Sequence, residues 1–121
     1  MYREGRRSTL LMLFGSNPKT RLLDLLIDNP LFEFTRSEIM EALGMAKVTI
    51  YNILPDLEKS GVIVETRKIG KASLFRLNRD SEVVKALEEV IRSYARALAD
   101  SENDITMISQ EAKAVKMTIV S

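Results

Sequence analysis

The sequence contains no cysteine and no histidine among its 121 residues. Without these side chains the protein has no disulfide, no zinc finger, no thiolate nucleophile and no imidazole base. Their absence excludes metal sensing through soft ligands and most hydrolase chemistry. The carboxylates that remain fall at the spacing of ordinary surface helices. We therefore predict that the protein is not an enzyme and binds no metal or cofactor.

Long apolar runs and phosphate-binding glycine motifs are also missing. No run of about 18 apolar residues is present, so the sequence predicts no membrane span. The apolar stretch 10–14 is too short for the core of a secretory signal peptide. The five glycines, at positions 5, 15, 44, 61 and 70, form no phosphate-cradling loop. We expect a small cytoplasmic protein.

Positive charge is concentrated in one part of a chain whose net charge is only +1. Residues 1–79 hold 13 Lys or Arg against 9 Asp or Glu, whereas residues 80–121 hold 5 against 8. The segment 62–79 alone has a net charge of +4. Such a patch suits contact with phosphates. Lys and Arg on a hairpin also protect a sheet edge from aggregation, and the charge alone does not separate these interpretations.

The middle of the sequence has the pattern of two helices joined by a glycine turn. Thr35 and Glu38 form a capping box that begins the first helix, and Gly44 ends it as a left-handed cap. The second helix is predicted from about Ala46 to Ser60. The apolar face of this second helix, directed toward the core, consists of Ile50, Ile53, Leu54 and Leu57.

A basic hairpin is predicted after these two helices. Two β-rich runs, 62–68 and 72–77, flank a glycine-containing turn at 69–71. Upstream of the helix pair, the pattern predicts a helix at 18–28 and a short strand at 32–34. The predicted fold is therefore mainly α with a small antiparallel β-hairpin.

A long helix is predicted from Ser81 onward. Its apolar residues recur at spacings of three and four, which is the a/d pattern of a heptad seam. The pattern stops at 100–104, and residues 115–120 allow a strand. A seam of this kind either packs within the monomer or joins two copies. We favour a homodimer interface made of Val84, Leu87, Ile91, Tyr94 and Leu98.

The segments 44–54 and 57–63, together with the basic hairpin, resemble the helix-turn-helix of prokaryotic winged-helix transcription regulators. The similarity is to the ArsR/MarR-like class, and residues 13–16 and 75–78 are similar to small archaeal members. The resemblance covers about residues 10–98. It implies a winged helix-turn-helix fold with a long C-terminal dimerisation helix.

Two features depart from the pattern of this class. Met45 and Ala46 stand where many members have a serine, so the second helix lacks a side-chain cap. Pro55 lies inside that helix, where a proline removes a backbone hydrogen bond and costs about 3 kcal/mol. Because Pro55 is predicted on the outward face, we expect the core to remain intact.

The resemblance implies a sequence-specific regulator of double-stranded DNA that acts as a homodimer. The second helix would read base edges in the major groove, and the hairpin, or wing, would contact phosphates. Lys19 and Arg21 are interpreted as surface charges without a DNA role. The alternative function is a protein-interaction module within a larger assembly. The candidate DNA contacts are Thr35, Arg36, Lys47, Val48, Thr49, Tyr51, Asn52, Arg67, Lys68 and Lys71.

The predicted domain organisation has four parts. Residues 1–16 form an N-terminal extension and residues 17–79 the winged helix-turn-helix domain. Residues 80–100 form the dimerisation helix, and residues 101–121 a tail of unknown role. The expected partners are double-stranded DNA and a second copy of the chain, with no membrane and no identified small-molecule effector.

Overall fold

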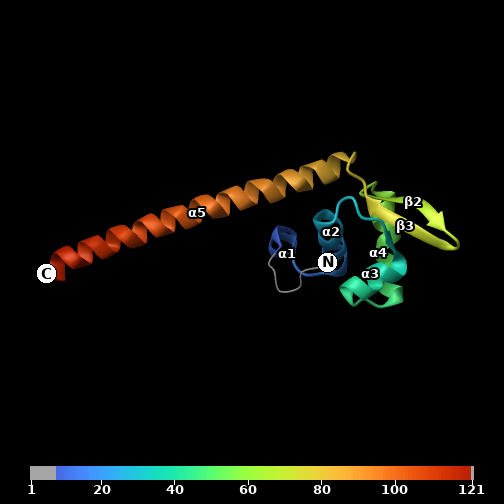
Figure 1. The fold of residues 1–121 in the computed structure, drawn as a ribbon, viewed down its shortest axis with the longest axis horizontal. Helices are drawn as coiled ribbons and strands as arrows, with labels where there is room; N and C mark the ends of the chain where they lie inside the picture. The colour runs from blue at the N-terminus through green and yellow to red at the C-terminus, as the bar shows by residue number, and fades with distance from the viewer. Residues whose placement is uncertain (1–7, 121) are drawn as a thin grey trace. The chain divides into compact units, whose positions relative to one another are not determined.

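The computed structural model describes residues 8–120, with side chains described for residues 8–101. The chain consists of two compact units, and the boundary between them follows Glu89. The elements in order are α1 (Thr9–Phe14), α2 (Pro18–Asp28), β1 (Phe34–Thr35), α3 (Arg36–Leu43), α4 (Lys47–Lys59), β2 (Ile63–Ile69), β3 (Ala72–Leu77) and α5 (Glu82–Val120) (Figure 1).

Helices α2 and α3 both begin at side-chain caps. The Asn17 side chain accepts a hydrogen bond of 3.0 Å from the Thr20 amide, and Pro18 takes the first helical position. At α3, the Thr35 hydroxyl accepts from the Glu38 amide at 3.1 Å, and the Glu38 carboxylate accepts from the Thr35 amide at 2.9 Å. The predicted capping box is therefore confirmed.

A tight turn joins α3 to α4 and creates the helix-turn-helix. Gly44 ends α3 with a φ of 62°, a conformation that glycine adopts without strain. Helix α4 then begins after Ala46 without a side-chain cap, as predicted. It continues through Pro55 to Lys59, so the exposed proline does not end the helix.

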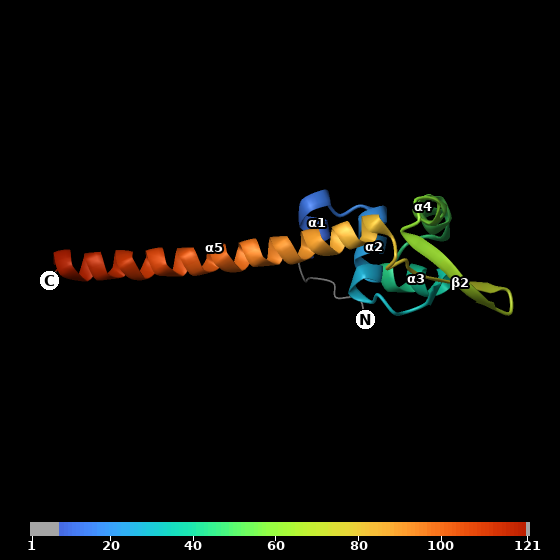
Figure 2. The same ribbon diagram turned by 90° about the horizontal axis from the view of Figure 1, so that it is seen from above.

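The strands form one antiparallel sheet in the order β1-β3-β2. Gly70, with a φ of 61°, makes the turn of the β2–β3 hairpin, and the hairpin projects beyond α3 and α4 (Figures 1 and 2). The predicted hairpin is confirmed. The short strand lies at Phe34–Thr35 rather than at 32–34, because Phe34 and Thr35 are the residues that pair with Phe75 and Leu74.

One apolar cluster holds the first unit together. It combines side chains from α2, α3, α4, the sheet and the first turn of α5. Full burial of one such aliphatic side chain stabilises a fold by about 1.5–3 kcal/mol, so these contacts dominate the packing. The members with no exposed surface are Leu22, Leu25, Leu26, Ile39, Ile50, Leu54 and Val84.

Helix α5 departs from the sequence prediction at both ends. At its start, Val84 is fully buried in the core of its own chain, so the prediction that it belongs to a dimer seam is wrong. The helix then runs to Val120, so it continues past 100–104, where the apolar pattern stops, and residues 115–120 are helical rather than the strand that the sequence allows. No helix in the described part of the chain is long and apolar enough to cross a membrane.

The order of elements defines the fold. Three helices, α2 to α4, precede a β-hairpin whose inner strand also pairs with β1, and a long helix follows. This is the winged helix-turn-helix arrangement that the sequence predicts, with α4 in the position of the recognition helix and the β2–β3 hairpin as the wing.

Candidate nucleic-acid interface

Helix α4 has one face in the core and one face open to solvent. Ile50, Leu54 and Leu57 anchor it, with at most 7% of each residue exposed. On the opposite side, Val48 is 66% exposed and Tyr51 is 49% exposed. The remaining predicted contacts on this helix are also accessible: Lys47 and Asn52 are exposed, and Thr49 is half-buried.

Two cations from different helices meet at the ring of Tyr51. The Arg36 guanidinium carbon, from the first residue of α3, lies 5.1 Å from the centre of this ring. The Lys47 ammonium nitrogen, from the first residue of α4, lies 5.4 Å from the same centre. Contacts of this length are attractive cation–π interactions. The fold thus brings three of the predicted DNA contacts into one cluster.

Arg36 also has a second aromatic contact, with Phe75 of β3. The Arg36 guanidinium carbon lies 4.7 Å from the centre of the Phe75 ring, and Phe75 itself is buried in the core. The sequence prediction missed Phe75 as a supporting residue, because the contact joins residues that are far apart in the chain. Stacking on two rings restricts the guanidinium more than a lone surface arginine would be restricted.

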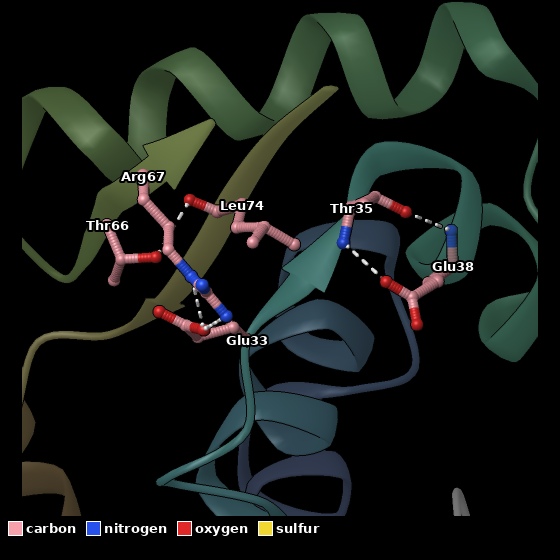
Figure 3. Close-up of polar contacts among 6 residues, drawn as sticks. All are labelled: Glu33, Thr35, Glu38, Thr66, Arg67 and Leu74. Carbon is pink, nitrogen blue, oxygen red and sulfur yellow. Dashed lines mark hydrogen bonds and ion pairs between the residues drawn. The ribbon is translucent and has the colours of Figure 1, made fainter. Parts of the chain in front are cut away.

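Thr35 has a structural role in this surface. Its hydroxyl oxygen accepts a hydrogen bond within the capping box (Figure 3), and the hydroxyl proton remains available as a donor. Because Thr35 is the N-cap of α3, it also sets the position of Arg36, the first residue of that helix. The predicted contact Thr35 is therefore at the same edge as the Tyr51 cluster.

The three predicted wing cations are not equivalent. Lys68 and Lys71 are exposed and form no ion pair with any residue that the structure describes. Arg67 is paired: its Nη2 lies 3.0 Å from Oε2 of Glu33, and its Nε donates to the same oxygen at 3.1 Å. Figure 3 shows the Arg67 side chain directed toward the Glu33 carboxylate.

Glu33 is the second functional residue that the sequence prediction missed. The hydroxyl of Thr66 and the hydrogen bond and charge of Arg67, with a smaller contribution from Arg76, hold the pKa of Glu33 below its ordinary value. The carboxylate is therefore charged at neutral pH. The alternation of aromatic and charged residues in 32–34 does contain a signal for the position of Glu33. In an extended chain, this alternation places Glu33 on the opposite side from Phe32 and Phe34.

Two further cations near these helices have structural partners. Lys19 of α2 forms an ion pair of 3.2 Å with Asp56 of α4, and Arg21 donates to the carbonyl oxygen of Leu43 at 2.6 Å. The second contact satisfies a carbonyl at the end of α3, which would otherwise lack a partner. Lys19 and Arg21 are therefore not simply solvated surface charges, as the sequence analysis interpreted them, because both side chains have partners within the fold.

The predicted dimer residues beyond Val84 lie along one side of α5. Leu87, Ile91 and Tyr94 are half-buried in the single chain, and Leu98 is 42% exposed. Val90, which widens this apolar stripe, is 39% exposed. An apolar stripe with this much accessible surface remains available for contact with another molecule.

Solved structures of other proteins share this fold, and a transcription regulator is among them. The chain is similar to MepR, a transcription regulator of the Staphylococcus aureus multidrug efflux pump MepA, with a TM-score of 0.58 and 19% identity over 88% of this chain and 82% of that chain. The S. aureus MepR–DNA complex matches with a TM-score of 0.56 and 20% identity, over 83% of this chain and 84% of that chain. M. tuberculosis Rv0081 matches with a TM-score of 0.54 and 21% identity, over 76% of this chain and 88% of that chain.

No protein-family model matches the sequence, and no curated protein matches it significantly. The likeness to the solved structures, at identities of 19% to 21%, shows the fold. The chain is therefore a winged-helix protein, and a fold of this kind does not by itself define a function.

Proposed function

We propose that this chain is a sequence-specific, double-stranded DNA-binding transcription regulator of the ArsR/MarR-like class, which acts in the cytoplasm as a homodimer. The observation that carries the proposal is the composition of one surface. An exposed and largely uncharged face of α4 lies beside the Arg36–Tyr51–Lys47 cluster. The wing adds Lys68 and Lys71, which form no ion pair with residues 8–101.

The residues of this surface divide by chemistry into base-reading and phosphate-binding groups. The amide of Asn52 can pair with adenine through two hydrogen bonds, and Val48 or Thr49 can contact a thymine methyl group. Arg36 and Lys47 carry charge next to this face and suit the phosphates on either side of the groove. This division supports a specific mode of binding, because phosphate contacts position the helix whereas base contacts select the sequence.

The fold likeness supports the same function. One of the similar structures is a complex of MepR with DNA. A winged helix that places a recognition helix and a wing beside each other matches the geometry in which a helix enters the major groove. We infer that α4 enters the groove and that the wing contacts the adjacent backbone.

The wing lysines provide the test of DNA binding. In the double variant Lys68→Ala/Lys71→Ala, affinity should fall on every duplex, and the slope of log affinity against log salt should flatten by about 0.9 for each lost phosphate contact. The variant Arg79→Ala/Lys85→Ala removes the same charge outside the candidate contacts and serves as the control. Equal effects of the two variants would show that only net charge matters, and a wild-type protein without salt-dependent binding would refute the function.

The homodimer is proposed through the apolar stripe of α5, with Leu87, Ile91, Tyr94 and Leu98 at its centre. Two linked copies would read half-sites about 10 base pairs apart. Ile91→Glu would place two unpaired carboxylates in this interface, each costing several kcal/mol. We expect a folded monomer with weaker DNA binding, because linkage of two half-site contacts is lost. A wild-type protein that sediments as a monomer at micromolar concentration would contradict this assembly.

A further inference from the structure

A β-bulge in the wing decides which face of the sheet Arg67 occupies. Glu65 lies opposite Phe75, but Arg67 rather than Thr66 lies opposite Leu74. The extra residue shifts the register by one, and such a shift moves the following side chains to the other face. Without the bulge, Arg67 would lie opposite Ser73, on the face that carries Phe75.

The bulge places Arg67 beside Glu33 on the outer face of the sheet. Thr35 of β1 also pairs with Leu74, so Thr35 and Arg67 flank this central residue from the two sides. Glu33 precedes Thr35 by two residues and therefore shares its face. Its carboxylate reaches across the central strand to Arg67, with N···O distances of 3.0 Å and 3.1 Å (Figure 3).

The ion pair with Glu33 engages Arg67, a cation of the wing that would otherwise be available to bind DNA. Of the predicted wing contacts, Lys68 and Lys71 have no ion-pair partner among the described residues, whereas Arg67 is held by a carboxylate from a different segment. Both sides of the pair keep solvent contact, at 61% side-chain exposure for Arg67 and 24% for Glu33. A pair with this exposure is weak enough for an incoming phosphate to replace the carboxylate.

We propose that Glu33 is an internal competitor for the DNA backbone, which holds Arg67 on the sheet until a phosphate displaces it. This inference rests on the proposed DNA-binding function and adds a residue that limits it. The competition lowers the affinity of the wing for DNA of any sequence, because the phosphate must replace an existing contact. Because this penalty is the same on every duplex, Glu33 sets the overall strength of DNA binding without touching DNA, and the choice of sequence stays with the base contacts of α4.

The test compares two variants that change the net charge equally. Glu33→Gln removes the carboxylate that holds Arg67. Glu65→Gln removes an exposed carboxylate on the same hairpin that forms no ion pair within residues 8–101. On a duplex of random sequence, Glu33→Gln should bind up to about fivefold more tightly than Glu65→Gln. This factor corresponds to the free energy of one exposed ion pair, which DNA no longer has to break in Glu33→Gln. Its salt slope should equal that of Glu65→Gln, because Arg67 contacts the phosphate in both complexes once the DNA is bound.

A second pair of variants assigns the effect to Arg67. In an Arg67→Ala background, Glu33→Gln and Glu65→Gln should have equal affinities for the random duplex, because the competing contact is already gone. Circular dichroism of each variant verifies that the fold is retained.

The outcomes separate this inference from the function on which it rests. If the wild type shows no salt-dependent DNA binding, the function itself fails. If the wild type binds but Glu33→Gln equals Glu65→Gln, the function stands and the competition is refuted. Weaker binding by Glu33→Gln than by Glu65→Gln would also overturn the proposal, because it would show that Glu33 presents Arg67 to DNA rather than withholding it.

Discussion

Replacement of Tyr51 by leucine tests whether its ring organises the positive charge beside α4. The ring contacts Arg36 at 5.1 Å and Lys47 at 5.4 Å, and leucine would remove both contacts while keeping an apolar side chain. Each exposed cation–π contact stabilises the arrangement by about 0.5–1 kcal/mol. The two contacts together therefore contribute at most about 2 kcal/mol to holding Arg36 and Lys47 at the Tyr51 ring.

The expected loss in DNA affinity follows from the freedom that the two cations regain. Ordering one long side chain on binding costs about 0.5–1.5 kcal/mol. Lys47 would regain its full freedom, whereas Arg36 would keep its contact with Phe75 at 4.7 Å. We therefore expect Tyr51→Leu to weaken DNA binding by about 1–2 kcal/mol, which corresponds to about 5- to 30-fold.

Fluorescence anisotropy with a labelled duplex measures this loss, and Tyr51→Phe is the matched control. Phenylalanine keeps the ring and removes the hydroxyl, so this variant should bind nearly as tightly as the wild type. Wild-type affinity in Tyr51→Leu would refute the reasoning. An equal loss in both variants would also refute it, because the hydroxyl rather than the ring would then be responsible.

Three further predictions concern base reading, the core and pH. Asn52→Ala should cost about 1–3 kcal/mol on a preferred duplex and little on random DNA, as competition binding assays would show. Val84→Ala should lower the free energy of unfolding by about 2–3 kcal/mol in urea titrations and leave the oligomeric state in sedimentation unchanged, because Val84 lies in the core of its own chain. Glu33 has a folded-state pKa below the ordinary value of 4.5, so the stability it contributes is present above that pH and is lost as the pH falls through the folded pKa. Urea midpoints should therefore drop less on acidification in Glu33→Gln than in the wild type, and equal drops would contradict the role of this carboxylate.

Local signals in the sequence predicted the helix-turn-helix and the wing. The Thr35–Glu38 capping box and the Gly44 cap are decided by residues within one or two helical turns, so their chemistry is visible in the sequence. The alternation of the two β-rich runs around Gly70 likewise predicted the hairpin. These features depend on short-range hydrogen bonds and on backbone preference.

The contacts that organise the candidate site could not be predicted in the same way. Arg36 meets Phe75, and Glu33 meets Arg67, only because β3 lies between β1 and β2 in the sheet. A single sequence contains no direct signal for such pairs. The bulge at Thr66 adds to the difficulty, because simple alternation would place Arg67 on the other face.

The errors in α5 have separate physical causes. A heptad pattern is the same whether its apolar residues pack in the core of their own chain or against a partner chain. The sequence prediction assigned Val84 to a partner interface, whereas it packs in the core of its own chain. The polar run at 100–104 contains no glycine or proline, and its residues cost a helix well under 1 kcal/mol each. Such a run weakens an amphipathic pattern without ending the helix.

The preference for one DNA sequence over others is the most direct test of the central claim. The measurement is the ratio of two dissociation constants at one salt concentration, for a duplex selected from a random pool and for an unselected duplex of the same length. An α4 that reads base edges predicts a ratio of about 1,000 or more for the wild type. A ratio near one would mean that the surface binds only phosphates, and it would contradict sequence-specific regulation by this protein.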